Sequence, residues 1–265
     1  TFATHADPRE FRMAPPPGSG PEDTKLLSED FDALEVLNSG EDEFEWAEMY
    51  PKFNDWFTLL SRGLRVTGTG VSDTHTQYAM SGGYWRTWVK LGIDAPADFS
   101  PALMSPALNA QRAISSNGPF VDVRVVRVDP GGAETSLPAG LGDTLAASPD
   151  DVQVTLDIQV PEYLDVTKVE LYMHTPADDA RCPIDPESPV ARTTRVACNG
   201  ETNRNWPAQS ITATSPVTLG PEDLEIVLDE GGVQYRRYRK QVRFTLPAPE
   251  TDNWIVAFVY GSKPL

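Results

Sequence analysis

An aspartate and a histidine lie two residues apart in the string Ser72-Asp73-Thr74-His75. They follow a predicted glycine-bearing strand, residues 65–69, where it passes into a loop. On a strand, positions i and i+2 point to the same side, so both side chains could reach one point. A carboxylate oxygen together with an imidazole nitrogen suits zinc, manganese or iron. The spacing predicts Asp73 and His75 as metal ligands, and the alternative is a structural aspartate beside a surface histidine.

A second candidate side chain lies in the string Tyr84-Trp85-Arg86-Thr87. A guanidinium fork matches the oxygens of phosphate or carboxylate, so Arg86 is a candidate for holding an anionic substrate. The alternative for this arginine is a buried structural ion pair. The sequence offers no Ser–His–Asp arrangement and no reactive cysteine as a rival nucleophile, so hydrolysis would depend on metal-activated water.

The acidic composition limits the partners. The 265 residues carry a net charge of -17, with an isoelectric point near 4.5. Such a surface repels phosphate over most of its area, so we expect no general nucleic-acid binding. No stretch approaches the length of a membrane-spanning helix, so we expect no membrane span.

Two cysteines, Cys182 and Cys198, share a polar loop without a nearby histidine. This context favours a disulfide over a metal site, with two unpaired thiols as the alternative. A disulfide would place the protein in an oxidising compartment, so the expected localisation is periplasmic or secreted.

The first part of the chain alternates strand and helix patterns. Residues 31–38 and 65–69 are expected as strands, and residues 41–62 as helix, divided at Pro51. Apolar side chains at helical spacing predict a buried stripe of Phe53, Trp56, Phe57 and Leu60.

Two further features lie in this part. Glu35, inside the apolar strand 31–38, either faces outward or assists a site. Ser105 and Pro106 predict the N-cap and first residue of a short helix that runs to about Ser115.

From residue 120 the pattern changes to period two with many β-branched residues. Val152, Val154, Leu156 and Ile158 alternate with polar neighbours, and turn residues separate several such runs. This predicts an all-β antiparallel sandwich of six to eight strands. The domain boundary is expected near residue 118.

Four strings resemble the PHP (polymerase and histidinol phosphatase) superfamily, in its carbaryl-hydrolase-like branch. They are DALEVLN at 32–38, NDWFTLLSRGLRVTGTGVSDTH at 54–75, GGYWRTWV at 82–89 and SNGPFVDVRV at 116–125. The family string usually has Pro where Trp85 stands.

The resemblance implies that residues 1–118 form the C-terminal part of an α/β barrel, the distorted (β/α)7 barrel of the family, ahead of the sandwich at 119–265. It also implies two or three divalent metal ions (zinc, manganese or iron) at the C-terminal ends of the strands. The ligand pair of the family matches Asp73 and His75. A further ligand histidine, from an Asn-His-Pro-type string, matches His5 in Thr4-His5-Ala6-Asp7-Pro8.

The family's first half carries a His-x-His motif, and none of the three histidines here is spaced in that way. A closed barrel also needs more strands than residues 1–118 supply. We therefore expect a C-terminal part of a longer polypeptide, whose N-terminal half is a partner in the same precursor or a separate fragment. His174 lies in the sandwich and is expected to be structural.

The function expected from these features is metal-dependent hydrolysis of a small anionic or ester substrate, as a phosphoesterase or ester hydrolase. The alternative is a non-catalytic binding or structural protein. In that alternative the PHP-like site is degenerate and the β-sandwich recognises a partner.

Overall fold

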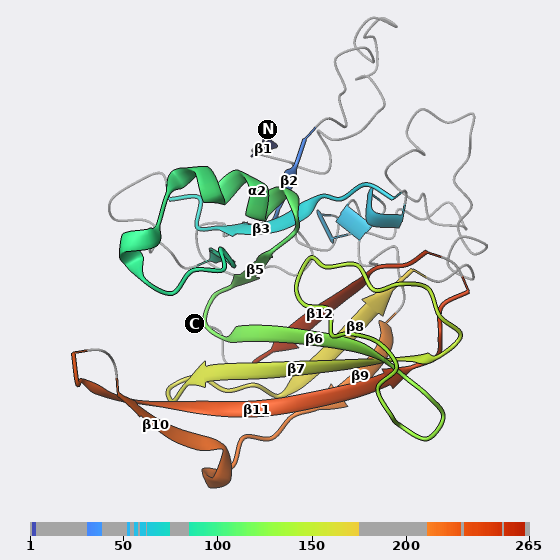
Figure 1. Cartoon of the computed structure of the whole chain (residues 1–265). Helices are drawn as coiled ribbons and strands as arrows, with labels where there is room; N and C mark the ends of the chain where they lie inside the picture. Colours follow the sequence, from blue (N-terminus) through green and yellow to red (C-terminus); the bar gives the residue numbers. More distant parts are fainter. Residues whose placement is uncertain are drawn as a thin grey trace, which may run out of the picture. The chain divides into compact units, whose positions relative to one another are not determined.

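Figure 1 shows the computed structural model, which describes residues 2–3, 31–38, 52–53, 56–57, 59–61, 63–74, 85–174, 211–228, 231–250 and 252–262. Among these residues 46% are in strands and 13% in helices, and the sheets include no barrel. The expected α/β barrel portion is therefore wrong. No helix within the described ranges is long and apolar enough to cross a membrane.

The chain divides into two compact units. The first comprises Thr1–Ser115 and Met173–Ser210, and the second comprises Ser116–Tyr172 and Ile211–Leu265. The sequence positions of all the candidate site residues fall in the first unit.

The first unit contains a three-stranded parallel sheet in the order β1-β2-β3. Its strands are β1 (Phe2–Ala3), β2 (Ala33–Asn38) and β3 (Thr67–Val71). The register places Ala33 of β2 beside both Phe2 and Thr67. Adjacent parallel strands have their carboxyl ends at the same edge of the sheet, which is where such sheets bind ligands.

A helical stretch precedes β3 and covers part of it. Residues 52–53, 56–57 and 59–61 are helical, and Phe53, Phe57 and Leu60 are buried as the apolar stripe predicts. The Trp56 indole lies against Gly68, where an added Cβ would stand 2.8 Å from the ring. Because β3 has no large side chain at this position, the aromatic ring can pack directly on its backbone.

One edge of β3 is closed by side chains. The Val66 carbonyl accepts from the Trp56 indole N–H at 2.8 Å and from the Gln111 amide at 3.2 Å. The Ser115 hydroxyl donates to the Gly68 carbonyl at 3.1 Å. Thr67, which lies between Val66 and Gly68, directs its N–H toward the Asp32 carbonyl on the β2 side. Successive residues of a strand direct their backbone polar groups to opposite edges, so the Val66 and Gly68 carbonyls face the edge away from β2.

Thr87 completes this closed edge at the end of β3. Its hydroxyl donates to the Gly70 carbonyl and accepts from the Gly70 N–H, both at 2.9 Å. A fourth barrel strand would need the groups that Thr87, Ser115 and Gln111 already use. Among the described strands the parallel sheet ends at β3, and this occupation of its edge is the physical reason.

The segment after the candidate site forms short elements. β4 (Arg86–Val89) and β5 (Ala113–Ser116) make a two-stranded sheet. The elements between them are η2 (Pro96–Asp98), η3 (Pro101–Leu103) and α2 (Met104–Asn109).

The helix predicted from Ser105 to Ser115 is therefore only partly correct. Helix α2 begins at Met104 and ends at Asn109, and Gln111 then takes a left-handed conformation with φ of 59°. The last predicted helical residues belong instead to strand β5. The helix ends where Gln111 takes this left-handed conformation, and the Gln111 side-chain amide donates to the Val66 carbonyl at 3.2 Å.

The second unit carries a four-stranded antiparallel sheet in the order β10-β11-β7-β6. Its strands are β6 (Phe120–Val128), β7 (Asp151–Pro161), β10 (Leu224–Leu228) and β11 (Gln234–Leu246), and the turn η4 (Pro221–Asp223) precedes β10. A second sheet has the order β12-β8-β9. It consists of β8 (Lys168–Met173), β9 (Ile211–Pro216) and β12 (Ile255–Tyr260).

Alternating apolar residues form the core of this unit. Val154, Leu156 and Ile158 of β7 are fully buried, as are Val169 and Leu171 of β8. The period-two pattern of β7 predicted from the sequence is confirmed, because its polar residues are only partly buried. Strand β7 thus buries one row of side chains, whereas β8 is buried at consecutive residues from Val169 to Met173.

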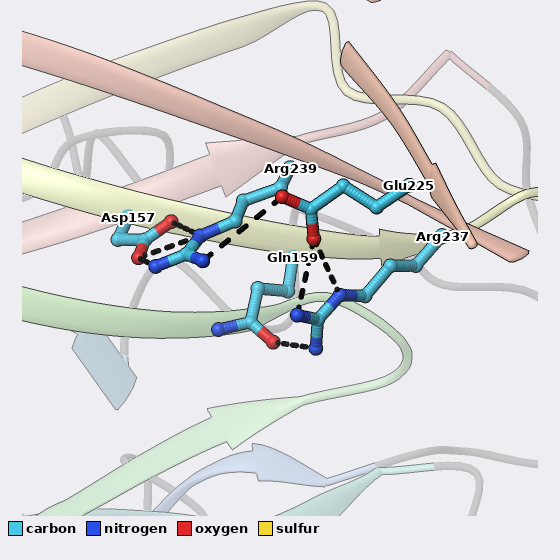
Figure 2. Close-up of polar contacts among 5 residues, drawn as sticks. All are labelled: Asp157, Gln159, Glu225, Arg237 and Arg239. Carbon is cyan, nitrogen blue, oxygen red and sulfur yellow. Dashed lines mark hydrogen bonds and ion pairs between the residues drawn. The ribbon is translucent and has the colours of Figure 1, made fainter. Parts of the chain in front are cut away.

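A polar network on the four-stranded sheet joins three strands (Figure 2). Arg237 bonds Glu225 of β10 at 3.1 Å and the Gln159 side-chain oxygen of β7 at 2.6 Å. Arg239 holds Asp157 of β7 in a two-oxygen contact at 2.9 and 3.0 Å, and it lies 4.0 Å from Glu225. Exposed ion pairs contribute little stability singly, but this set fixes the position of β10 on the sheet.

A buried carboxylate lies on the other sheet. Lys168 Nζ is 2.7 Å from Glu170 Oε1, and the Tyr172 hydroxyl donates to Glu170 Oε2 at 3.0 Å. The same ammonium lies 4.3 Å from the centroid of the Tyr260 ring. Burial acts to raise the pKa of Glu170, but hydrogen bonds from Lys168, Tyr260 and Tyr172 outweigh it and lower that pKa below its usual value.

Glu170→Gln should make the second unit less sensitive to acid. The folded pKa of Glu170 lies below its ordinary value of about 4.5, so the carboxylate stabilises the fold above that pH. This contribution is lost as the pH falls through the folded pKa. Urea midpoints measured from pH 7 to pH 3 should fall more steeply in the wild type than in Glu170→Gln, while the exposed-site control Glu162→Gln follows the wild type. Equal slopes in the wild type and Glu170→Gln would contradict the assignment.

Thr87→Val should destabilise the first unit. The variant keeps the shape of the side chain but leaves both polar groups of Gly70 without the hydroxyl, which costs about 1–3 kcal/mol for a buried group. Thr87→Ser restores the hydroxyl and should recover most of that loss. The measurement is urea unfolding of the three proteins, and a Thr87→Val midpoint equal to that of the wild type would show that this contact does not hold β3.

Candidate functional site

The candidate site lies at the carboxyl ends of β1, β2 and β3. Because these neighbouring strands are parallel, their carboxyl ends meet at one edge. In the sequence, His5 follows the last residue of β1 by two positions. Asp73 and His75 follow the last residue of β3 by two and four positions. In the sequence, each candidate ligand thus follows the end of a strand by two to four residues.

Asp73 has a backbone conformation that differs from the expected one. Strand β3 ends at Val71, two residues later than expected, and Asp73 has a φ of 48°. A residue other than glycine in this left-handed region is uncommon, and such conformations gather at functional sites. Asp73 therefore lies in the irregular segment after β3 and not on the strand, so the i and i+2 geometry of a strand does not apply to it, and its role as a metal ligand stays a prediction. Asp73 is half-buried.

Arg86 lies beside the end of β3. It precedes Thr87, whose hydroxyl bonds both backbone polar groups of Gly70. An added Cβ on Gly70 would stand 3.4 Å from the Arg86 carbonyl oxygen, so the two backbones approach closely. Arg86 itself is exposed, so the alternative of a buried ion pair does not apply to it.

Several predicted residues lie outside the described part of the chain. These are His5, His75, Cys182 and Cys198, so the disulfide and two of the three metal ligands stay predictions. Within the described ranges, no group of three or more His, Cys, Asp or Glu side chains could hold a metal ion. Glu35, half-buried on β2, is paired in register with Thr69 of β3.

Two contributors to the site were not predicted from the sequence. Thr87 closes the edge of β3, and Gly70 allows β4 and β5 to approach, since its added Cβ would lie 3.4 Å from the Arg86 carbonyl oxygen and 3.1 Å from the Ser115 Cβ. The sequence does contain a signal for the close approach at Gly70. Glycines at alternate positions of a strand, here Gly68 and Gly70, mark places where another backbone or ring approaches closely.

Of the predicted ligands, the described residues include only the carboxylate of Asp73, and the imidazoles of His5 and His75 stay predictions. This mixed donor set is compatible with zinc, manganese or iron. Comparison of the chain with protein-family models, curated proteins and solved structures finds no match.

Proposed function

We propose that the protein is a metal-dependent hydrolase whose site lies at the carboxyl edge of the β1-β2-β3 sheet. The observation that carries this proposal is the left-handed Asp73, two residues beyond the end of a buried parallel strand. Strain of this kind at the ligand-binding edge of a sheet is typical of functional residues. Asp73, His75 and His5 are the proposed ligands.

The proposed chemistry is attack by metal-activated water. A bound divalent ion lowers the pKa of its water toward neutrality and stabilises the negative charge that develops on the substrate. Two or three zinc, manganese or iron ions would suit the donor set. The local resemblance to the PHP superfamily supports the same chemistry. The barrel of that family gives no such support, because the described sheets do not form one.

Arg86 is proposed to hold the substrate. It is exposed, and it lies on the strand that Thr87 attaches to the end of β3. A guanidinium there favours an anionic group, so phosphoesters and esters that carry a carboxylate are the expected substrate classes.

Asp73→Asn should remove metal and turnover together. Asparagine tolerates the left-handed conformation, so the backbone is preserved while the charged ligand is lost. After loading with manganese or zinc and dialysis, the bound metal measured by mass spectrometry should fall by at least one equivalent. Hydrolysis of p-nitrophenyl phosphate or acetate should fall by roughly 100-fold or more, because loss of a residue that merely supports a metal ligand already costs about 10–100-fold and Asp73 is proposed as a ligand itself.

The matched control is Asp94→Asn, which removes an exposed carboxylate from a loop of the same unit. This variant should retain both metal and activity. If Asp73→Asn and Asp94→Asn retain equal metal, Asp73 is not a ligand and the proposed site is wrong.

A further inference from the structure

The β10–β11 hairpin extends beyond the rest of its sheet (Figure 1). Strand β11 pairs with β7 only from Arg237 onward, whereas it pairs with β10 from Gln234 to Tyr238. The pairs from Ile226–Arg236 to Leu228–Gln234 therefore form a two-stranded ribbon. A ribbon of two strands buries little surface by itself.

This projecting ribbon exposes large apolar side chains. Ile226 is 62% exposed, Leu228 66%, Val233 62% and Tyr235 45%. Ile226 and Leu228 alternate along β10 and lie on one face of the ribbon, whereas Tyr235 pairs in register with Val227 and lies on the other face. Neighbouring exposed apolar residues on one face are typical of an interaction site, whereas single exposed residues are ordinary.

The outer edge of β10 is open to strand addition. β10 is the terminal strand of its sheet, and its pairing with β11 has no bulge. Residues 224–228 contain no proline and no lysine, the two residue types that commonly protect an edge strand. The single charge, Glu225, is held by Arg237 in the network of Figure 2.

The same network keeps this edge in a fixed conformation. Glu225 contacts two arginines of β11, and those arginines contact Asp157 and Gln159 of β7. An edge that is already ordered loses little conformational entropy when a further strand pairs with it.

Charge indicates what kind of strand would bind. In the sequence, residues 221–230 hold five carboxylates and no Lys or Arg. Four cations of β11 are paired with carboxylates: Arg236 with Glu162 at 3.3 Å, Arg237 with Glu225 at 3.1 Å, Arg239 with Asp157, and Lys240 with Asp223 at 2.9 Å. Two of these carboxylates, Asp223 and Glu225, belong to residues 221–230. With a net charge of -17, the chain repels a second copy of itself and attracts a basic partner.

We propose that β10 is a docking edge for an extended basic segment of a partner protein, which adds to the sheet as a further strand. Backbone hydrogen bonds to β10 would supply affinity, and apolar side chains of the segment would cover Ile226 and Leu228. Lys or Arg residues flanking the segment would meet the acidic surroundings, with exposed Glu222 among them.

The test measures binding of labelled synthetic peptides by fluorescence anisotropy. The probe Lys-Lys-Thr-Val-Thr-Val-Thr-Val-Lys-Lys should bind saturably, and less tightly as salt is added. A probe with Glu in place of every Lys, and a probe with Pro-Pro at its centre, should each bind at least about tenfold more weakly, because they lose charge attraction and strand pairing respectively.

Paired variants locate the binding edge. The double variant Ile226→Gln/Leu228→Gln should weaken binding of the basic probe by about tenfold, since it removes the apolar contact without changing charge. The control Leu137→Gln changes a residue of the same unit that is 87% exposed and should leave binding unchanged. Both sites are exposed, so these variants should fold, which circular dichroism checks.

Three results would overturn the proposal. They are equal binding of the basic and Pro-Pro probes, equal binding by the double variant and the wild type, and sedimentation that shows self-association lost in the double variant. The last would assign the edge to a second copy of this chain instead.

Discussion

The closure of one edge of β3 by side chains is the constraint on which the first unit depends. A parallel strand has hydrogen-bonding groups on both edges, and β2 pairs with only one of them. Gln111, Ser115 and Thr87 bond to the carbonyls of the other edge at alternate residues. All three residues come after Asp73 in the sequence. The segment that follows Asp73 therefore returns to stabilise β3, the strand that precedes it.

This closure places Asp73 in a defined setting. Thr87 fixes Gly70 near the end of the strand, and Asp73, three residues later, has a φ of 48°. A metal ligand gains from such support, because its position is set before the ion binds. The same contacts bring the exposed Arg86 to the end of β3, on the strand that Thr87 anchors.

Local patterns predicted elements better than they predicted architecture. The alternation in Val154, Leu156 and Ile158 predicted a strand with one buried face, because burial of every second residue depends only on strand geometry. The helical spacing of Phe53 and Phe57 predicted a buried face in the same way. The barrel expected from the sequence was wrong, and local patterns could not have corrected it. Whether a further strand can pair with β3 depends on which side chains occupy its edge, and the Thr87 hydroxyl that does so lies more than 15 residues from Gly70 in the sequence. The left-handed conformation of Asp73 was not predicted either.

The most direct test of the proposed site is anomalous X-ray diffraction from crystals grown with zinc or manganese. If Asp73 is a ligand, we expect an anomalous peak about 2.0–2.2 Å from one of its carboxylate oxygens, with imidazole nitrogen completing the coordination. Peaks found only at other acidic side chains, with none at Asp73, would contradict a metal site at the carboxyl edge of the parallel sheet.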